Sequence, residues 1–295
     1  SNHFKAGHIS TTHKGITVII LKIVFTCTYW GCEDMLAEAF IDRVILAGYD
    51  GIEISLPLSG EFTNTFLKKL DKVREQRPDF IFIAQQLTTP ESENIDAYIL
   101  KMERRLAELI SYQPHFINSH TGRDYFSFED NCRVIEAAMQ MSIKSGIPIY
   151  HETHRGRFSF HASTLLSYLN KFPDLELVGD FSHFCVVSES MLEEQKNILQ
   201  AIIPHVAHLH ARVGSEQAPQ VNDPAAPEWQ HHLEIYMAWW KQILDIKRET
   251  GWDTFTITPE FGPYPYMPQA PFTQEALSNQ WINNIFMANL LKKYF

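Results

Sequence analysis

Several features that mark common classes of protein are scarce or absent in this chain of 295 residues. It has only four cysteines, Cys27, Cys32, Cys132 and Cys185, and no two of them form a C-x-x-C pair. In a chain this long, such cysteines are most simply reduced thiols that are buried as small apolar residues. The sequence therefore predicts no disulfide framework, and it favours a cytoplasmic protein.

Basic charge is also scarce, because the formal net charge is −10. A nucleic-acid binder usually needs a basic face that neutralises phosphates, so the composition disfavours nucleic acid as a partner. The longest apolar run near the N-terminus, GITVIILKIVFTC, is interrupted by Lys22 and is too short to span a bilayer. No cleavage pattern of small residues follows it, so we expect neither a membrane segment nor a signal peptide. Residues 1–20 are expected to be an N-terminal extension. Because the chain opens SNHF without methionine, its start is expected to be either processed or derived in part from cloning.

What the sequence does contain is a regular alternation of strand-like and helix-like runs. Strand-like runs occupy residues 21–29, 51–56, 79–87, 114–120, 147–152, 175–183, 205–213 and 254–260. Helix-like runs occupy residues 34–48, 64–77, 92–112, 127–146, 159–172, 188–203, 229–251 and 273–294. Ser92 and Asn94 are the candidate caps of the third helix, and Gly146 is the expected end of the fourth.

This alternation predicts the fold class. Strands that alternate with helices imply a parallel sheet with helices outside it. Eight such units close a (β/α)8 TIM barrel, so we expect a single domain over residues 1–295. A doubly wound open sheet is the competitor, but the G-x-G-x-x-G loop typical of that fold is missing.

Acidic and imidazole side chains gather at the carboxyl ends of the predicted strands, where a TIM barrel has its catalytic face. The last four strands end in Glu152, Asp180, His210 and Glu260. A lone acid at such a position is usually solvated, but three carboxylates in one barrel mouth would repel one another and raise their pKa values. A divalent cation removes that cost. Three oxygens and one nitrogen suit Mn²⁺ or Mg²⁺ first, with Co²⁺ or Zn²⁺ as alternatives.

Four motifs carry a resemblance to a known superfamily: YHETHRGR at 150–157, GDFSH at 179–183, HLHARV at 208–213 and TPEFG at 258–262. From about residue 23 onward the chain resembles the metal-dependent xylose isomerase-like TIM barrels. These include sugar isomerases, ketose 3-epimerases, hydroxypyruvate isomerase relatives and the DNA-repair endonuclease IV family. The resemblance implies that Glu152, Asp180, His210 and Glu260 bind one divalent metal ion. It also implies that Glu152 and Glu260 are catalytic and transfer the proton.

Other residues are expected to contact the substrate. His183 matches a histidine that usually contacts a substrate oxygen in the superfamily, and His120 is assigned a similar contact. Arg212 is a candidate because the epimerases keep an arginine nearby, although at a different spacing. Trp30, with Tyr29, Phe184 and Phe261, either forms an apolar wall against a sugar or simply packs in the core.

The motif YHETHRGR contains further candidates. Strand alternation sends Tyr150, Glu152 and His154 to one side, so His154 either orients Glu152 or binds a substrate hydroxyl. His151 faces the other way and is expected to pack against the helices. Arg155 and Arg157 lie in the following loop. One of them either binds an anionic group such as phosphate or carboxylate, or forms a salt bridge with a loop acid.

The endonuclease IV relatives need three metal ions and therefore more histidines than this chain offers. Strand three presents Gln85 and Gln86 where a histidine would be expected, and the segment VNDPAAPEW lacks the D-x-H pair of that family. Together with the acidic net charge, these differences disfavour cleavage at abasic sites.

The resemblance implies a divalent-metal-dependent isomerase or epimerase of a sugar or sugar phosphate. One glutamate would remove a proton next to a carbonyl, the metal would stabilise the enediolate, and the other glutamate would return the proton. The partner would be a small-molecule carbohydrate. A non-catalytic sugar-binding barrel and a metal-dependent lyase or dehydratase are the alternatives. Superfamily members often pair through outer helices, so a homo-oligomer is left open.

Overall fold

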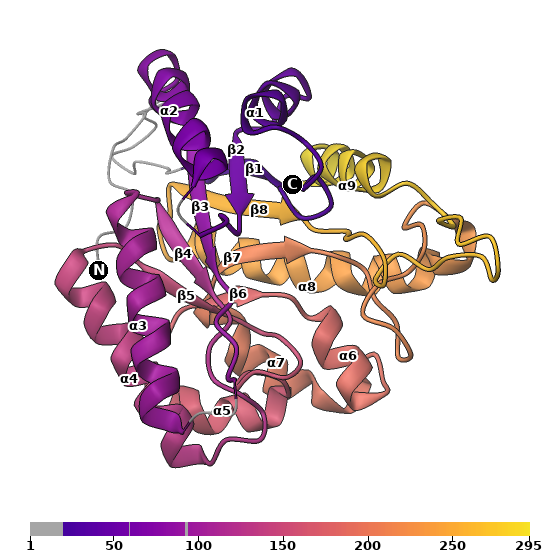
Figure 1. Ribbon diagram of the computed structural model, residues 1–295. Coiled ribbons are helices and arrows are strands. Elements are labelled where there is room, and N and C mark those ends of the chain that lie inside the picture. The colour runs from indigo at the N-terminus through magenta and orange to yellow at the C-terminus, as the bar shows by residue number, and fades with distance from the viewer. Residues whose placement is uncertain (1–19, 59, 92–93) are drawn as a thin grey trace, which may run out of the picture.

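A closed barrel of parallel strands forms the centre of the structure (Figure 1). The computed structural model describes residues 20–58, 60–91 and 94–295, so the predicted N-terminal extension lies almost entirely outside the described residues. The strands pair in chain order, and β8 closes the barrel by pairing with β1, where Phe25 lies opposite Ile257. The strands are β1 Lys22–Thr28, β2 Gly51–Ile54, β3 Ile81–Gln86, β4 Phe116–Ser119, β5 Ile149–Glu152, β6 Leu177–Gly179, β7 Val206–Ala211 and β8 Thr254–Pro259. The predicted (β/α)8 architecture is confirmed.

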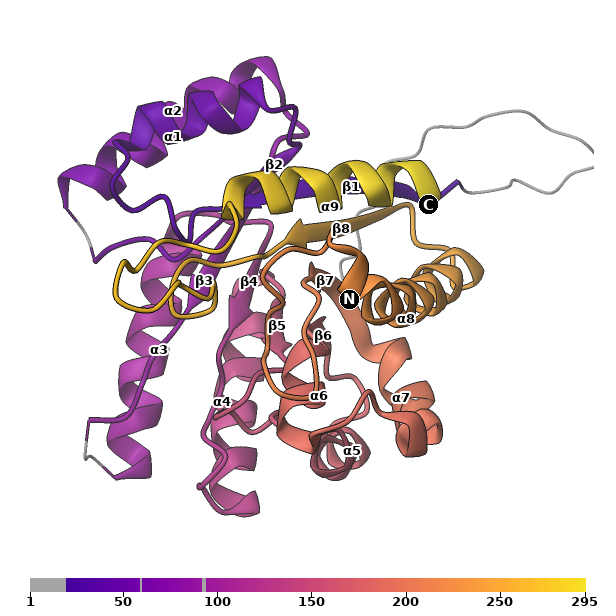
Figure 2. The same cartoon turned by 90° about the vertical axis from the view of Figure 1, so that its right-hand side faces the viewer.

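Helices surround the barrel on its outer side (Figures 1 and 2). They are α1 Ala37–Leu46, α2 Glu61–Gln76, α3 Ile95–Ser111, α4 Phe128–Ser145, α5 Ala162–Lys171, α6 Ser182–Ser188, α7 Lys196–Ile202, α8 Gln230–Glu249 and α9 Gln280–Tyr294. Short 3-10 turns lie at Glu193–Gln195, Ile203–His205 and Pro227–Trp229. Figure 2 shows α9 lying along β1, where Lys292 Nζ is 5.3 Å from the ring centre of Phe25. Among the described residues, no helix combines the length and apolar composition needed to cross a bilayer.

The ends of two helices follow the expected capping chemistry. The side chain of Asn94 accepts a hydrogen bond of 2.9 Å from the backbone N–H of Ala97 and so caps α3. The other candidate cap, Ser92, lies outside the described residues. Gly146 ends α4 in the left-handed conformation, with φ of 74°, as predicted.

The chain after β6 differs from the sequence prediction. The predicted strand 175–183 is too long, because β6 ends at Gly179 and α6 begins at Ser182. The side chain of Asp180 accepts hydrogen bonds from the backbone N–H and the hydroxyl of Ser182, at 3.1 and 2.6 Å, and this favours a helical turn at once. The predicted helix 188–203 is accordingly replaced by α6, a 3-10 turn and α7.

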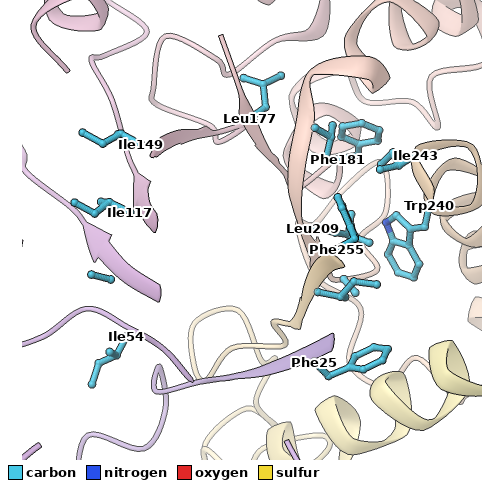
Figure 3. Close-up of a cluster of buried hydrophobic side chains, with 14 of the residues drawn as sticks. Phe25, Ile54, Ile117, Ile149, Leu177, Phe181, Leu209, Trp240, Ile243 and Phe255 are labelled. Carbon is cyan, nitrogen blue, oxygen red and sulfur yellow. The ribbon is translucent and has the colours of Figure 1, made fainter. Parts of the chain in front are cut away.

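Two hydrophobic clusters divide the side chains of the strands between them. The larger cluster lies between the barrel and the helices, where Leu209 and Phe255 pack with Trp240 and Ile243 of α8 (Figure 3). The smaller cluster fills the inside of the barrel towards the amino ends of the strands; its members are Val24, Ile81, Ile83, Phe116, Tyr150, Val178 and Ala207. Inward-facing positions nearer the carboxyl ends are left for polar residues, and these build the site.

Candidate metal centre and active site

A cavity of about 330 Å³ opens at the carboxyl ends of the strands. Most of its wall comes from residues at or just beyond a strand end. They include Trp30 after β1, Gln85 in β3, His120 after β4, Glu152 in β5, Arg212 after β7 and Glu260 after β8. Cavities of this size hold small-molecule ligands, and this face is the catalytic face of TIM barrels.

The four predicted metal ligands lie together, and two of them, Glu152 and Glu260, line this cavity. Glu152, Asp180, His210 and Glu260 each bring one ligand atom within 4.8 Å of the others. All four residues are buried, with at most 5% of their surface exposed. Three buried carboxylates repel one another, so this arrangement has the chemistry of a site for a divalent cation.

The unpaired nitrogen of His210 tests whether these residues fit a metal ion. Its Nδ1 atom lies 2.7 Å from Glu260 Oε2 and 3.4 Å from Glu152 Oε1. Neither contact has the alignment of a hydrogen bond, and Nδ1 is a buried atom without a hydrogen-bond partner. His210 Nδ1 and the carboxylate oxygens of Glu152 and Glu260 therefore converge without hydrogen-bonding to each other. The ligand atoms of a metal ion are arranged in this way. The residues present therefore fit a divalent ion.

The opposite edge of the His210 ring is held by Glu53, a residue of β2. His210 Nε2 lies 2.8 and 3.0 Å from the two carboxylate oxygens of Glu53. Glu53 is fully buried and also accepts a hydrogen bond of 3.3 Å from Asn118 Nδ2. A histidine whose Nε2–H donates to a carboxylate presents the lone pair of Nδ1 to an ion. From the sequence alone, no role was assigned to Glu53.

Buried charge shifts the pKa values of this cluster. Burial alone would lower the pKa of His210, but the carboxylates of Glu260, Glu53 and Glu152 raise it well above its ordinary value. Burial raises the pKa of Glu260 to about 7, an effect that the charge of Glu152 increases and that His210 opposes. Positive charge, whether a proton or a metal ion, is therefore strongly favoured at His210 Nδ1.

Arg212, predicted as a substrate contact, is 1% exposed and forms a buried ion pair with Asp180. Its Nη2 also lies 3.0 Å from His183 Nε2. Because a guanidinium only donates, His183 Nε2 accepts, and the hydrogen of this imidazole is on Nδ1. That Nδ1 is buried and has no hydrogen-bond partner. The guanidinium also faces the rings of Trp30 and Tyr266, at 5.8 and 4.7 Å, so Arg212 joins the cluster to the cavity wall.

His120 lies on the other side of the cluster. Its Nε2 is 2.8 Å from Glu152 Oε2, and its Nδ1 is 3.3 Å from Arg157 Nη2. The same argument assigns the hydrogen of His120 to Nε2, which donates to Glu152. The ring of His154 stacks between two others, with centroids 4.5 Å from His120 and 3.9 Å from His183. Burial lowers the pKa of His154 well below its ordinary value, so this imidazole is neutral.

Among the described residues, two other groups of acidic and imidazole side chains are close enough to hold an ion: His120 with Glu152 and His154, and Glu53 with His208 and His210. In the second group, His208 is already bonded through both nitrogens. Its Nδ1 lies 2.6 Å from Thr256 Oγ1, and its Nε2 lies 3.1 Å from Thr258 Oγ1. We therefore interpret His208 as a structural residue that packs on Phe116 inside the barrel.

The aromatic candidates divide into wall and core. Trp30 and Tyr29 line the cavity, whereas Phe184 and Phe261 are fully buried in the large hydrophobic cluster and form no part of the cavity wall. A Cβ atom on Gly262 would lie 2.1 Å from the Trp30 ring, so the glycine of TPEFG is required by the close approach of this tryptophan. Tyr266 packs edge-on against Trp30, with ring centres 4.9 Å apart, and was missed by the sequence analysis.

The arginines of the YHETHRGR motif lie above the site. Arg155 is exposed, and its guanidinium is 5.1 Å from the ring centre of Tyr266, a residue of the cavity wall. Arg157 is half-buried and donates to His120. Within the described ranges, neither arginine forms the salt bridge to a loop acid that was left open above. His151 faces the helices, as predicted, and its Nδ1 is 2.6 Å from Thr121 Oγ1.

Comparison with known proteins identifies the fold. No protein-family model and no curated protein matches the sequence. A solved structure described as a xylose isomerase-like TIM barrel protein from Mycobacterium smegmatis, in complex with magnesium, matches with a TM-score of 0.59 and 11% identity, over 92% of this chain and 97% of that one. The fold is a xylose isomerase-like TIM barrel.

Two further structures with this xylose isomerase-like fold carry functional descriptions. A sugar phosphate isomerase/epimerase from Parabacteroides distasonis matches with a TM-score of 0.53 and 12% identity, over 92% of this chain and 98% of that one. A probable 3-DHS dehydratase involved in petrobactin synthesis, from Bacillus anthracis, matches with a TM-score of 0.58 and 15% identity, over 93% and 100%. At identities this low the likeness establishes the fold, and the chemistry has to be argued from the site.

Proposed function

We propose that the protein is a divalent-metal-dependent isomerase or epimerase of a sugar or sugar phosphate. The observation that carries this proposal is the convergence of Glu152, Asp180, His210 and Glu260, two of which line a small-molecule cavity. An ion held there would supply the Lewis-acid charge that stabilises an enediolate. Mn²⁺ or Mg²⁺ suits the donor set best.

Glu152 and Glu260 are proposed to move the proton. Both line the cavity, and they come from separate strands, β5 and the end of β8, so they approach a bound sugar from different sides. Removal of a proton on one face and its return on the other gives an epimer, and return to the neighbouring carbon gives an aldose–ketose isomer. His120 donates to Glu152, and Gln85 Nε2 lies 3.5 Å from Glu260 Oε1, so each carboxylate has a neighbour that can orient it.

Other residues are proposed to bind and enclose the substrate. The buried Nδ1–H of His183 has no hydrogen-bond partner within the described residues, and such a donor suits a substrate oxygen. Trp30 and Tyr266 form an aromatic wall that would exclude water from one side of the ring. His154 and Arg155 stand at the same opening and remain candidates for contact with hydroxyl or anionic groups.

The proposal is tested by hydrogen exchange. Mn²⁺-loaded protein is incubated in D₂O with a panel of ketoses and ketose phosphates, and ¹H NMR follows the loss of signal at carbons next to the carbonyl. We expect exchange and product formation with at least one sugar, and a loss of about a hundredfold or more in Glu260→Gln. Glu33→Gln is the matched control, because Glu33 lines the same cavity but bonds only to the backbone N–H of Gly31. Exchange of no sugar by metal-loaded protein, or full activity of Glu260→Gln, would contradict the proposal.

A dehydratase is the second candidate, and the neutral His154 favours it. This imidazole stacks against His183 and offers a third proton acceptor besides the two glutamates. The similarity to the Bacillus anthracis structure adds to this candidate, although only through the fold. Dehydration would begin with the same proton removal, and the hydroxyl group on the next carbon would then take up that proton and leave as water. The exchange assay separates the two, since a dehydratase forms a product that lacks one water, which mass spectrometry detects.

A further inference from the structure

Two arginines from neighbouring loops lie together beside the candidate site. Arg123 follows β4 and Arg157 follows β5. A Cβ atom on Gly156 would lie 3.9 Å from Arg123 Nη2, so this guanidinium lies against the turn that carries Arg157. The two loops are also joined by the backbone N–H of Asp124, which donates to Gly156 O at 3.4 Å. Burial, and then the charge of Arg123, lower the pKa of Arg157, which shows that the two cations are close.

The hydrogen-bonding capacity of this pair is largely unused. Within the part of the chain that the structure describes, neither arginine has a carboxylate partner, and the Nε atom of each is buried without a hydrogen-bond partner. Arg157 donates only to Gly156 O and His120 Nδ1, both at 3.3 Å, and the guanidinium of Arg123 stands 5.6 Å from the ring centre of Tyr125. Each guanidinium has five N–H donors, and two partly buried cations without an anion are unfavourable. A chain with net charge −10 has acids that could have paired with them.

One side chain, that of His120, connects the arginine pair to the four candidate metal ligands. His120 Nδ1 contacts Arg157, while its Nε2 contacts Glu152, and His120 itself lines the cavity. Neither arginine lines the cavity itself, so His120 is the side chain past which a molecule in the cavity would meet the arginine pair. Arg155 adds a third positive charge above the opening, on the ring of Tyr266.

We propose that Arg123 and Arg157 bind an oxyanion carried by the substrate, so that the protein acts on a sugar phosphate or a sugar acid in preference to a neutral sugar. Guanidinium groups bind carboxylate and phosphate through paired N–H donors, and these charge-assisted hydrogen bonds are among the strongest in proteins. This proposal rests on the proposed function, since it assigns the class of substrate to the same site.

The first experiment measures anion binding directly. Inorganic phosphate and acetate are titrated into the full-length, Mn²⁺-loaded protein by isothermal titration calorimetry, and again into protein without added metal. Arg123→Gln is the decisive variant, because no hydrogen bond or ion pair within the described residues joins the side chain of Arg123 to His120 or to the four candidate metal ligands. We expect it to weaken phosphate binding about tenfold or more. Arg133→Gln is the matched control, since Arg133 is half-exposed and already paired with Asp96. The phosphate affinity of this variant should equal that of the wild type.

The outcomes separate this proposal from the proposed function. Saturable phosphate binding that is lost in Arg123→Gln, with unchanged Mn²⁺ affinity, supports the arginine site. Equal binding in the wild type and Arg123→Gln, or no saturable binding with and without metal, overturns it. Failure of the wild type to bind Mn²⁺ would overturn the metal-dependent function, while the titration without metal would still decide the arginine site. Arg157→Lys, checked for folding by circular dichroism, should keep the charge but weaken binding because it lacks the paired donors.

The second experiment distinguishes the sources of the anion. The exchange assay compares each ketose with its phosphate ester and with the corresponding sugar acid. We expect Arg123→Gln to raise KM about tenfold for whichever anionic substrate the wild type prefers, and to leave KM for the neutral sugar unchanged. A wild type that prefers the neutral sugar, or an equal rise of KM for neutral and anionic sugars, would contradict the proposal.

Discussion

Glu53 holds His210 from the side opposite its free nitrogen, with 2.8 Å between Glu53 Oε2 and His210 Nε2. The two residues come from β2 and β7, which are not neighbours in the barrel. Their contact fixes both the orientation of the imidazole and the nitrogen that carries its hydrogen. A carboxylate behind a ligating histidine also makes the histidine a stronger donor to the metal.

Replacing Glu53 should weaken metal binding without removing a ligand. Glu53→Gln keeps the shape of the side chain but removes the charge behind His210, so we expect the Mn²⁺ affinity to fall about 10- to 100-fold. Isothermal titration calorimetry measures this, with Glu33→Gln as a control for the loss of a carboxylate elsewhere in the cavity. An unchanged Mn²⁺ affinity in Glu53→Gln would show that the contact with His210 is only structural.

Metal affinity should depend on pH in a defined direction. The surrounding carboxylates raise the pKa of His210 well above its ordinary value, so a proton occupies Nδ1 near neutral pH and competes with the ion. Lowering the pH from about 8 to about 6 should therefore weaken Mn²⁺ binding, and binding should release protons. Calorimetry in two buffers with different ionisation enthalpies counts those protons. Affinity that does not change with pH would mean that His210 is not protonated in the metal-free protein.

His151 should make the fold sensitive to mild acid. Burial lowers its pKa to about 4 in the folded protein, against about 6.5 when unfolded. The unfolded chain therefore binds more protons in this interval, so stability is complete above about pH 6.5 and is lost as the pH falls towards 4, by at most about 3 kcal/mol. Urea unfolding at several pH values measures the slope, which should be shallower in His151→Gln. Burial also lowers the pKa of His115 to about 4, so His115 titrates in the same interval. The free energy of unfolding of His151→Gln should therefore still depend on pH.

The fold was predictable because its signals are local. Each strand and most helices show their own apolar pattern, and eight repeats of that pattern allow few architectures. The prediction was wrong after β6, where α6 has seven residues, too few to show a helical period, and begins with the contact between Asp180 and Ser182. The last helix was predicted from residue 273, but α9 begins at Gln280, after a loop in which Phe272 and Gln274 have positive φ angles.

The residues that cluster at the candidate site were predictable, but the residues that support them were not. Strand alternation and strand ends place Glu152 and Glu260 in the barrel mouth without any knowledge of tertiary contacts. The contacts of Glu53 with His210 and of Arg157 with His120 join residues that are distant in the chain. No spacing rule connects such pairs, because their distance depends on how the barrel closes. The same reason explains why the ion pair of Arg212 with Asp180 was not predicted, although Arg212 itself was a candidate for contact with the substrate.

The buried pair of Arg212 and Asp180 gives the last prediction. Removing one member of such a pair leaves an uncompensated charge in the protein interior, so Arg212→Met should lower the free energy of unfolding by about 3–5 kcal/mol. Arg212→Lys should lower the free energy of unfolding by less, because it keeps the positive charge. Some loss should remain, because lysine lacks the planar group that faces Trp30 and Tyr266. Urea unfolding without metal measures both variants, and Arg212→Met/Asp180→Asn should recover part of the loss because no unpaired charge remains. If Arg212→Met unfolds at the same urea concentration as the wild type, Arg212 is not needed to neutralise Asp180, and its role lies with the ligand in the cavity.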